Sequence, residues 1–212
     1  MSSTGFTEVT AQLIEQAAER LSGVTVETPL QFNQRLSDAT GAQVWLKRED
    51  LQPVRSYKLR GAYNLIAQLD AAERAAGVVC ASAGNHGQGV AYACARLGIR
   101  AQIFVPSTTP RQKRQRMRQL GEGWADLIVH GDTYDEAAEL AQRVAADEGR
   151  TLVPAFDDPR TIAGQGTVAV EIVNQLGHAP DTLIVPVGGG GMIAGCLTWL
   201  SQRHPATKVV GA

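Results

Sequence analysis

Residues 77–105 read GVVCASAGNHGQGVAYACARLGIRAQIFV, and this stretch decides the fold. Two short apolar runs rich in β-branched residues, 77–81 and 101–105, predict strands. Between them, 85–97 has the spacing of a helix, and Gly98 stands where a helix C-cap is expected. A strand, a helix and a second strand at this separation predict a parallel pair joined by a right-handed crossover.

The same alternation continues beyond residue 105. We expect strands at 126–130 and 151–153 and helices at 109–120 and 133–148. Thr133 and Glu136 have the pattern of a capping box at the start of the last helix, and Gly149 stands at its end. Repeated βα units predict an α/β fold built on a parallel sheet.

Further elements are expected on both sides of this region. Towards the N-terminus they are a helix at 11–21, a strand at 43–47, and a helix at 57–69 with Ser56 as N-cap. Towards the C-terminus they are a strand at 182–187, a helix ending near Arg203, and a strand at 208–210. Because no element follows this last strand, we expect the sequence to be a truncated part of a longer protein.

The composition is that of an ordinary globular protein, with 44% hydrophobic and 19% charged residues and a net charge of -1. This charge argues against a general nucleic-acid role. No membrane span is predicted, and residues 1–10 lack the pattern of a secretory signal. The spacing of Cys80, Cys94 and Cys196 fits no metal site, and reduced, buried thiols in the cytoplasm are expected.

One segment carries a notable positive charge. It contains five basic residues within eight positions, namely Arg111, Lys113, Arg114, Arg116 and Arg118. A nucleic-acid site is one interpretation of such a run. A solvated helix face, or a face paired with acidic neighbours, is favoured because no aromatic residues are interleaved.

Lys58 is the first candidate for chemistry, within the stretch SYKLRGA at 56–62. A lysine at the start of a helix feels the positive end of the helix dipole, which disfavours the protonated amine. The neutral amine is the form that attacks a carbonyl carbon. The alternative is a solvent-exposed lysine on a polar helix face.

The loop ASAGNHGQG at 81–89 is the second candidate, because it joins a predicted strand to a helix. Ligands bind at this end of strands in parallel sheets, and free N–H groups at a helix start suit a carboxylate or phosphate. Ser82 and Asn85 add polar side chains. A tight turn with an Asn cap is the alternative, and His86 by itself is more often structural than catalytic.

The third candidate is the glycine run at 188–191, which also follows a strand and opens a helix. Consecutive glycines let the backbone approach a phosphate closely. Gly189, Gly191 and Ala194 also fit a dinucleotide-binding pattern, but that pattern needs an acidic residue about twenty positions later. Position 209 is Val, and no acidic residue follows Gly191, so this alternative is weak.

Together the three loops resemble those of the fold-type-II pyridoxal-phosphate enzymes, the tryptophan synthase β-like class, and are most similar to the threonine dehydratases (threonine ammonia-lyases). The resemblance runs from about residue 28 to the end, with the motifs in family order. It implies two parallel-sheet α/β domains. The larger, cofactor-binding domain would comprise 1–68 and 158–212 and be incomplete at its C-terminal part. The smaller, four-stranded domain would be inserted at 69–157.

The resemblance also assigns roles to single residues. Lys58 matches the lysine that carries pyridoxal 5'-phosphate as a Schiff base and acts as the catalytic base. Asn85 matches the residue that binds the phenolic oxygen of the cofactor. The substrate carboxylate is expected at the loop with Ser82, Asn85 and His86. The cofactor phosphate is expected at a loop made of Gly188, Gly189, Gly190, Gly191 and Met192.

The implied activity is the deamination of L-threonine to 2-oxobutanoate and ammonia by β-elimination of water, a step of isoleucine biosynthesis, with L-serine also converted to pyruvate. Ala83 replaces a serine that serine racemases use as a base, and Phe156 resembles the dehydratase version. A catabolic dehydratase and a serine racemase-like relative are the alternatives within the family. A truncated, non-catalytic fragment is the alternative of another class.

Two further expectations follow from the resemblance. The residue that faces the pyridine nitrogen would lie beyond position 212. The full-length protein would be a homo-oligomer, a dimer or tetramer, that acts on a small amino acid and binds neither nucleic acid nor membrane.

Overall fold

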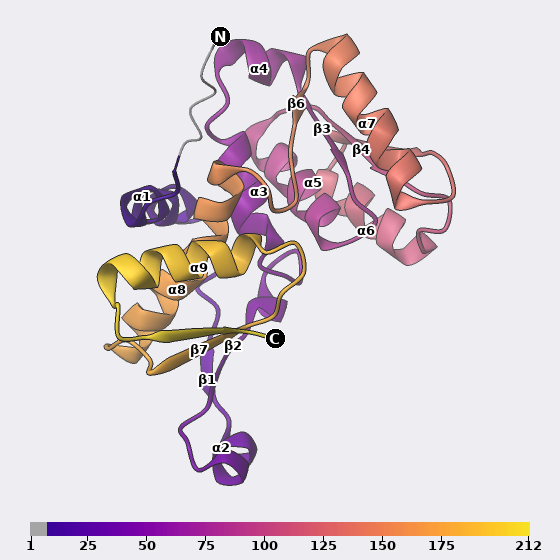
Figure 1. Ribbon diagram of the computed structural model, residues 1–212. Helices are drawn as coiled ribbons and strands as arrows, with labels where there is room; N and C mark the ends of the chain where they lie inside the picture. Colours follow the sequence, from indigo (N-terminus) through magenta and orange to yellow (C-terminus); the bar gives the residue numbers. More distant parts are fainter. Residues whose placement is uncertain (1–7) are drawn as a thin grey trace.

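The computed structural model describes residues 8–212 (Figure 1). The prediction about a secretory signal concerns residues 1–10, most of which lie outside this range. One group of elements surrounds a four-stranded sheet, another surrounds helices α8 and α9, and α3 lies between them (Figure 1). Within the described range, no helix combines the length and the apolar character needed to cross a membrane.

The four-stranded sheet has the order β5-β4-β3-β6, and all neighbouring strands are parallel. Its strands are β3 (Val78–Ala81), β4 (Ala101–Val105), β5 (Ala125–Val129) and β6 (Thr151–Leu152). Its helices are α5 (Asn85–Leu97), α6 (Arg111–Gly121) and α7 (Tyr134–Glu148). The predicted α/β fold is confirmed, and each predicted element of this sheet is displaced by no more than two residues at either end.

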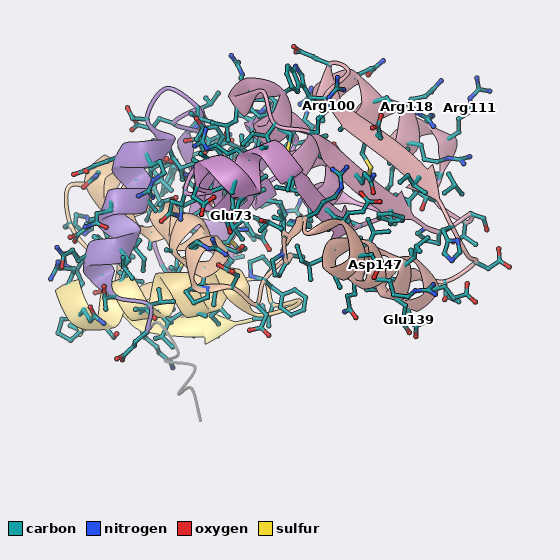
Figure 2. All side chains as sticks on the ribbon, turned by 90° about the horizontal axis from the view of Figure 1, so that it is seen from above. Glu73, Arg100, Arg111, Arg118, Glu139 and Asp147 are labelled. Carbon is teal, nitrogen blue, oxygen red and sulfur yellow. The ribbon has the colours of Figure 1, made fainter. Side chains whose placement is uncertain are left out.

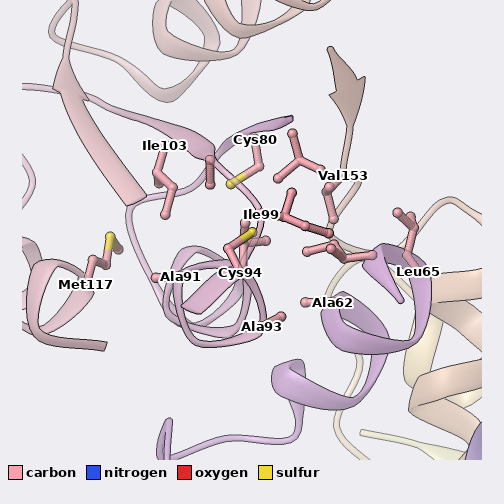
Figure 3. Packing of buried hydrophobic residues seen from close by; sticks show 14 of the residues in the cluster. Ala62, Leu65, Cys80, Ala91, Ala93, Cys94, Ile99, Ile103, Met117 and Val153 are labelled. Carbon is pink, nitrogen blue, oxygen red and sulfur yellow. The ribbon is translucent and has the colours of Figure 1, made fainter. Parts of the chain in front are cut away.

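Each face of this sheet has its own core, because successive side chains of a strand point to opposite faces. On one face, Cys80 of β3 is buried with Cys94 of α5 (Figure 3). On the other face, Val79 is buried with Ala137 of α7. Burial raises the pKa of the Cys94 thiol to about 12, so this thiol is protonated at neutral pH.

Three of the five basic residues of α6, Arg111, Lys113 and Arg118, are exposed, and the half-buried Arg116 donates to the carbonyl oxygen of Pro53 (2.9 Å). Within residues 8–212 none of the five forms an ion pair. Figure 2 shows Arg111 and Arg118 on the side of the molecule opposite to Glu139 and Asp147 of α7. This separation agrees with a solvated helix face and not with a face paired to acidic neighbours.

The second group of elements contains two small sheets. β7 (Thr182–Val185) and β8 (Lys208–Gly211) are parallel, and α9 (Gly191–Arg203) connects them. β1 (Leu30–Phe32) and β2 (Trp45–Lys47) are antiparallel and are connected through α2 (Gln34–Thr40). Helices α1 (Ala11–Leu21) and α8 (Pro159–Leu176) share one buried core with α9 and β7.

Helix α8 lies against two other helices at glycine residues. A Cβ added to Gly164 would lie 2.7 Å from the Cα of Gly61 in α3 (Lys58–Ile66). A Cβ added to Gly166 would lie 2.9 Å from the carbonyl carbon of Gly195 in α9. The backbones of α3, α8 and α9 therefore approach as closely as glycine allows, which ties the starts of α3 and α9 to one central helix.

A buried cluster of charged side chains also connects α3 with α8. Arg60 of α3 is fully buried, and its guanidinium lies 2.8 Å from Glu49, in the 3₁₀ helix η1 (Glu49–Leu51), and 2.7 Å from Glu171 of α8. Lys47 Nζ lies 2.6 Å from Glu171. Because each charge has a partner, the cluster joins α3, α8 and η1 without an uncompensated buried ion.

The predicted N-cap role of Ser56 is wrong. Tyr57 is the N-cap residue and already has helical dihedral angles (φ -66°, ψ -14°), whereas a side-chain cap needs an extended residue at this place. The Ser56 hydroxyl is buried without a hydrogen-bond partner in the described part of the chain. The helix also ends at Ile66, before the predicted residue 69, and α4 (Ala71–Ala76) follows after a capping box of Asp70 and Glu73.

Candidate active site

Lys58 is the first residue of α3. Its Nζ atom donates a hydrogen bond to the carbonyl oxygen of Ala155 (2.9 Å) and lies 5.2 Å from the centroid of the Tyr57 ring. Burial lowers the pKa of the Lys58 ammonium, because the charged form loses hydration. A lysine with a lowered pKa has more of the uncharged amine, which can attack a carbonyl carbon or accept a proton.

Helix α5, which follows the loop after β3, lies beside Lys58 at Gly89. A Cβ on Gly89 would lie 3.0 Å from the carbonyl oxygen of Lys58 and 3.2 Å from the backbone nitrogen of Leu59. Glycine at this position lets α5 approach the start of α3 without displacing its backbone. The first and second predicted motifs therefore meet in the structure.

Ser82 and Asn85 occupy different places in this loop. The Ser82 hydroxyl oxygen accepts hydrogen bonds from the backbone N–H groups of Gly84 (3.2 Å) and Gly87 (3.0 Å). Ser82 thus holds the loop in shape, and its own hydroxyl proton is left to donate. Asn85 is the first residue of α5 and is exposed. It forms no side-chain hydrogen bond within residues 8–212, so its amide is available to a ligand.

The His86 ring is buried and faces the protein. Its Nε2 atom lies 2.8 Å from the carbonyl oxygen of Val153 and, because that oxygen only accepts, Nε2 carries the ring proton. The Nδ1 atom is buried without a partner in the described residues. Burial lowers the pKa of His86 to about 4, and the nearby Lys58 charge adds to this. The neutral ring is not a cation for a carboxylate, so only the backbone N–H of His86 fits the predicted substrate contact.

The glycine run occupies the turn between β7 and α9. Gly190 has φ 87° and is the N-cap residue of α9, with no side-chain cap. A Cβ on Gly188 or Gly190 would meet nothing within 4 Å. The first N–H groups of a helix have no partner inside it, and they attract anions. Within residues 8–212 the N–H groups of the run have no partner, and they lie beside open space.

Met192 contributes differently from the glycines before it. Its side chain is only 9% exposed and packs in the core with Cys196 and Val185. The side chain anchors the first turn of α9. Met192 can therefore contribute only its backbone to the predicted phosphate loop.

The glycine run is linked to Lys58 through the segment after β6. Phe156 lies against the run: a Cβ on Gly191 would lie 2.8 Å from the Phe156 carbonyl oxygen, and one on Gly189 would overlap the Phe156 ring. The preceding residue, Ala155, accepts the hydrogen bond from Lys58. All three predicted motifs thus meet around residues 153–156.

The carbonyl groups of Val153 and Ala155 are contacts that sequence reasoning missed. Backbone acceptors leave no trace in residue type, so no signal could have found them. Phe156 had a signal, its dehydratase-like neighbourhood, but the sequence did not predict its contact with the glycine run. No group of three His, Cys, Asp or Glu side chains among the described residues could hold a metal ion.

A family model described as "Pyridoxal-phosphate dependent enzyme" matches residues 21–212. A protein of Mycobacterium bovis named "L-threonine dehydratase biosynthetic IlvA" is 59% identical over 198 residues. That alignment covers 93% of this chain and 46% of the relative, so the chain spans about half the length of the curated relatives it matches.

Two solved structures have a similar fold. The processed form of threonine deaminase isoform 2 from Solanum lycopersicum has a TM-score of 0.89 and 43% identity, over 94% of this chain and 54% of that one. Maize serine racemase has a TM-score of 0.91 and 30% identity, over 96% of this chain and 61% of that one.

Proposed function

The chain belongs to the family of pyridoxal-phosphate dependent enzymes, and on that premise we propose that it forms the cofactor-binding part of a biosynthetic L-threonine dehydratase. The observation that carries the proposal is the environment of the Lys58 amine. The amine is partly desolvated and bonded to Ala155, next to Phe156, which packs against the glycine run. An amine of lowered pKa and an anion site joined in this way suit an aldehyde that carries a phosphate.

The residues present fit this cofactor. The unpaired N–H groups of the glycine run 188–191 and of Met192 would hold the phosphate, and the open space at Gly188 and Gly190 leaves room for it. Lys58 would bind the aldehyde carbon through Nζ. The free amide of Asn85 would donate to the phenolic oxygen. When bound, pyridoxal phosphate withdraws electrons from the substrate Cα and makes its proton removable.

The protein's own groups would then bind the substrate and move the proton. The loop with Ser82, Asn85 and His86 would receive the L-threonine carboxylate through N–H groups at the start of α5. Lys58 Nζ would take the Cα proton, because burial favours its uncharged form. Loss of the β-hydroxyl as water, and then of ammonia by hydrolysis, leaves 2-oxobutanoate.

The substrate and the pathway are inferred from the names of the relatives. Those names say "biosynthetic", which supports a role in isoleucine biosynthesis over a catabolic one. L-serine has the same leaving group one carbon from Cα and would give pyruvate.

A serine racemase-like activity is the second candidate, since maize serine racemase has a similar fold. Racemisation needs a second proton carrier on the face opposite the lysine. By the family resemblance that carrier would stand at Ala83, whose methyl group cannot carry a proton. This favours elimination over racemisation.

A homo-oligomer in the cytoplasm is proposed for the full-length protein. The three buried, unpaired cysteines suit a reducing compartment. The residue that faces the pyridine nitrogen would come from the part of the relatives that this chain does not cover.

Covalent labelling tests the proposal. The chain is incubated with pyridoxal phosphate, reduced with borohydride and mapped by peptide mass spectrometry. We expect the label on Lys58, its loss in Lys58→Ala, and its retention in the control Lys113→Ala on the exposed face of α6. Label on other lysines alone would contradict the cofactor assignment. Formation of 2-oxobutanoate from L-threonine would then separate an enzyme from a non-catalytic fragment.

A further inference from the structure

Four consecutive residues after β6 contact four different parts of the molecule. The carbonyl oxygen of Val153 accepts from His86 of α5 (2.8 Å), and that of Pro154 accepts from Thr161 of α8 (3.3 Å). Ala155 accepts from Lys58 of α3, and Phe156 packs against the glycine run before α9. We call residues 153–156 the linking segment.

Phe156 contacts some residues of the glycine run and not others. The Phe156 ring fills the volume that a Cβ on Gly189 would occupy, and the Phe156 backbone lies against Gly191. Gly188 and Gly190 have no atom at the corresponding places. Alternate residues of the run are therefore held by Phe156, and the residues between them are free to face a ligand.

A run of four glycines needs such support. Glycine loses more conformational freedom on folding than any other residue, so an unsupported run samples many backbone conformations. An anion site made of backbone N–H groups works only when those groups converge on one point. Neighbouring side chains must supply the order that the glycines lack.

We propose that Phe156 is a positioning residue that holds the glycine run in its anion-binding conformation. The proposal rests on the proposed function in one respect, that the anion is the cofactor phosphate. Because Ala155 precedes Phe156 and accepts from Lys58, the same segment sets the distance between the amine and the anion site.

Backbone nitrogen-15 relaxation tests the positioning directly, because it reports the order of an N–H group that has no hydrogen-bond partner. In Phe156→Ala we expect the order parameters of the Gly189 and Gly191 amides to fall from about 0.85 to below about 0.6, because the ring no longer holds the run. Phe156→Leu, which keeps a bulky apolar side chain, should restore most of the order. The amides of β7 should be unchanged. Phe156 is 42% exposed, so the variant should remain folded. Unchanged order parameters at both glycines in Phe156→Ala would overturn the proposal.

A double-mutant cycle gives a second test. Gly189→Ala places a methyl group in the volume of the ring, so it should lower the thermal midpoint. In Gly189→Ala combined with Phe156→Ala that volume is free, so the double variant should lose less than the sum of the two single losses. Gly188→Ala has open space at its Cβ and should combine additively with Phe156→Ala. Additivity at position 189 would contradict the contact.

Binding measurements connect the contact with the cofactor. Affinity for inorganic phosphate, followed by calorimetry, should fall about tenfold in Phe156→Ala and recover in Phe156→Leu, because a mobile loop must be ordered on binding. Equal affinity in Phe156→Ala and the unaltered chain would overturn the proposal. Failure of pyridoxal phosphate to label Lys58, with the order parameters changed as expected, would instead remove the proposed function and leave the positioning role of Phe156.

Discussion

Lys58 and His86 lie in the same candidate site, and burial lowers the pKa of both. Each donates to a carbonyl of the linking segment, Lys58 to Ala155 and His86 to Val153. Burial thus shifts each side chain towards its uncharged form where its ligand would bind. An uncharged His86 beside Lys58 also avoids a second positive charge, which would hinder protonation of the amine when it acts as a base.

His86 should make stability depend on pH. Its pKa is lowered from 6.5 to about 4, so between these values the unfolded state binds a proton that the folded state does not. Stability therefore falls as pH falls through this window, by at most about 3 kcal/mol at about 1.4 kcal/mol per pKa unit. Urea unfolding at a series of pH values should give a shallower loss in His86→Gln than in the unaltered chain.

The control for this experiment is His178→Gln, since His178 is exposed. Its pH dependence should match that of the unaltered chain. A His86→Gln variant with the same dependence as the unaltered chain would show that the His86 ring takes up its proton in the folded state.

For single residues, the sequence predicts which side chains take part in the site better than it predicts where those side chains point. The motifs around Lys58 and the glycine run could be recognised because their chemistry requires those residues. The direction of the His86 ring could not, because its partner Val153 lies 67 positions away on another element. The Ser56 cap failed for a similar reason, since the dihedral angles of Tyr57 decide where α3 begins.

Among the elements, α8 is the one that organises the others. It approaches α3 at Gly164 and α9 at Gly166, so the starts of both neighbouring helices depend on its position. The sequence pattern does not predict this helix. Gly164 and Gly166 lower its helix propensity, and burial on several sides removes the single apolar stripe by which helices are recognised.

Gly195→Ala should disturb this packing. The added Cβ would lie 2.7 Å from the backbone nitrogen of Gly166, and backbone cannot move aside as a side chain can. We expect a loss of about 1–3 kcal/mol in the free energy of unfolding, measured by denaturant titration, together with weaker phosphate binding as α9 shifts. The control is Leu197→Ala on the exposed face of α9, expected to change stability by less than about 0.5 kcal/mol.

A Gly195→Ala variant as stable as the unaltered chain would mean that α8 and α9 can separate slightly at no cost. The close approach would then not position the glycine run. Phosphate affinity measured on the same sample distinguishes a shift of α9 from a general loss of stability.

For the whole molecule, the main feature is an apolar groove between the β1–β2 pair and β7. It is a pocket of about 330 Å³ whose lining includes Trp45, Leu46 and Ile184. Ile184 is 66% exposed, and within residues 8–212 strand β7 pairs only with β8. An apolar surface beside an unpaired strand edge promotes association.

We expect the isolated chain to bind the dye ANS and to self-associate as concentration rises, measured by fluorescence and analytical ultracentrifugation. Ile184→Lys should reduce both effects by placing a charge in the groove. Val129→Lys is the matched control, because Val129 is also exposed (41%) but belongs to β5, outside the groove. Equal effects of the two substitutions would show that the groove is not the associating surface.

The buried ion pairs of Arg60 also have a consequence for folding during synthesis of the chain on the ribosome. Glu171 is 111 positions later in the chain than Arg60. At about 5–20 residues per second, a ribosome needs on the order of ten seconds to deliver this counter-charge. The whole four-stranded sheet is synthesised in that interval, when Glu49 is the one of the two carboxylates that is already available to Arg60. Vectorial synthesis therefore makes the docking of α8 onto α3 a late event, after the β3–β6 sheet has had time to form.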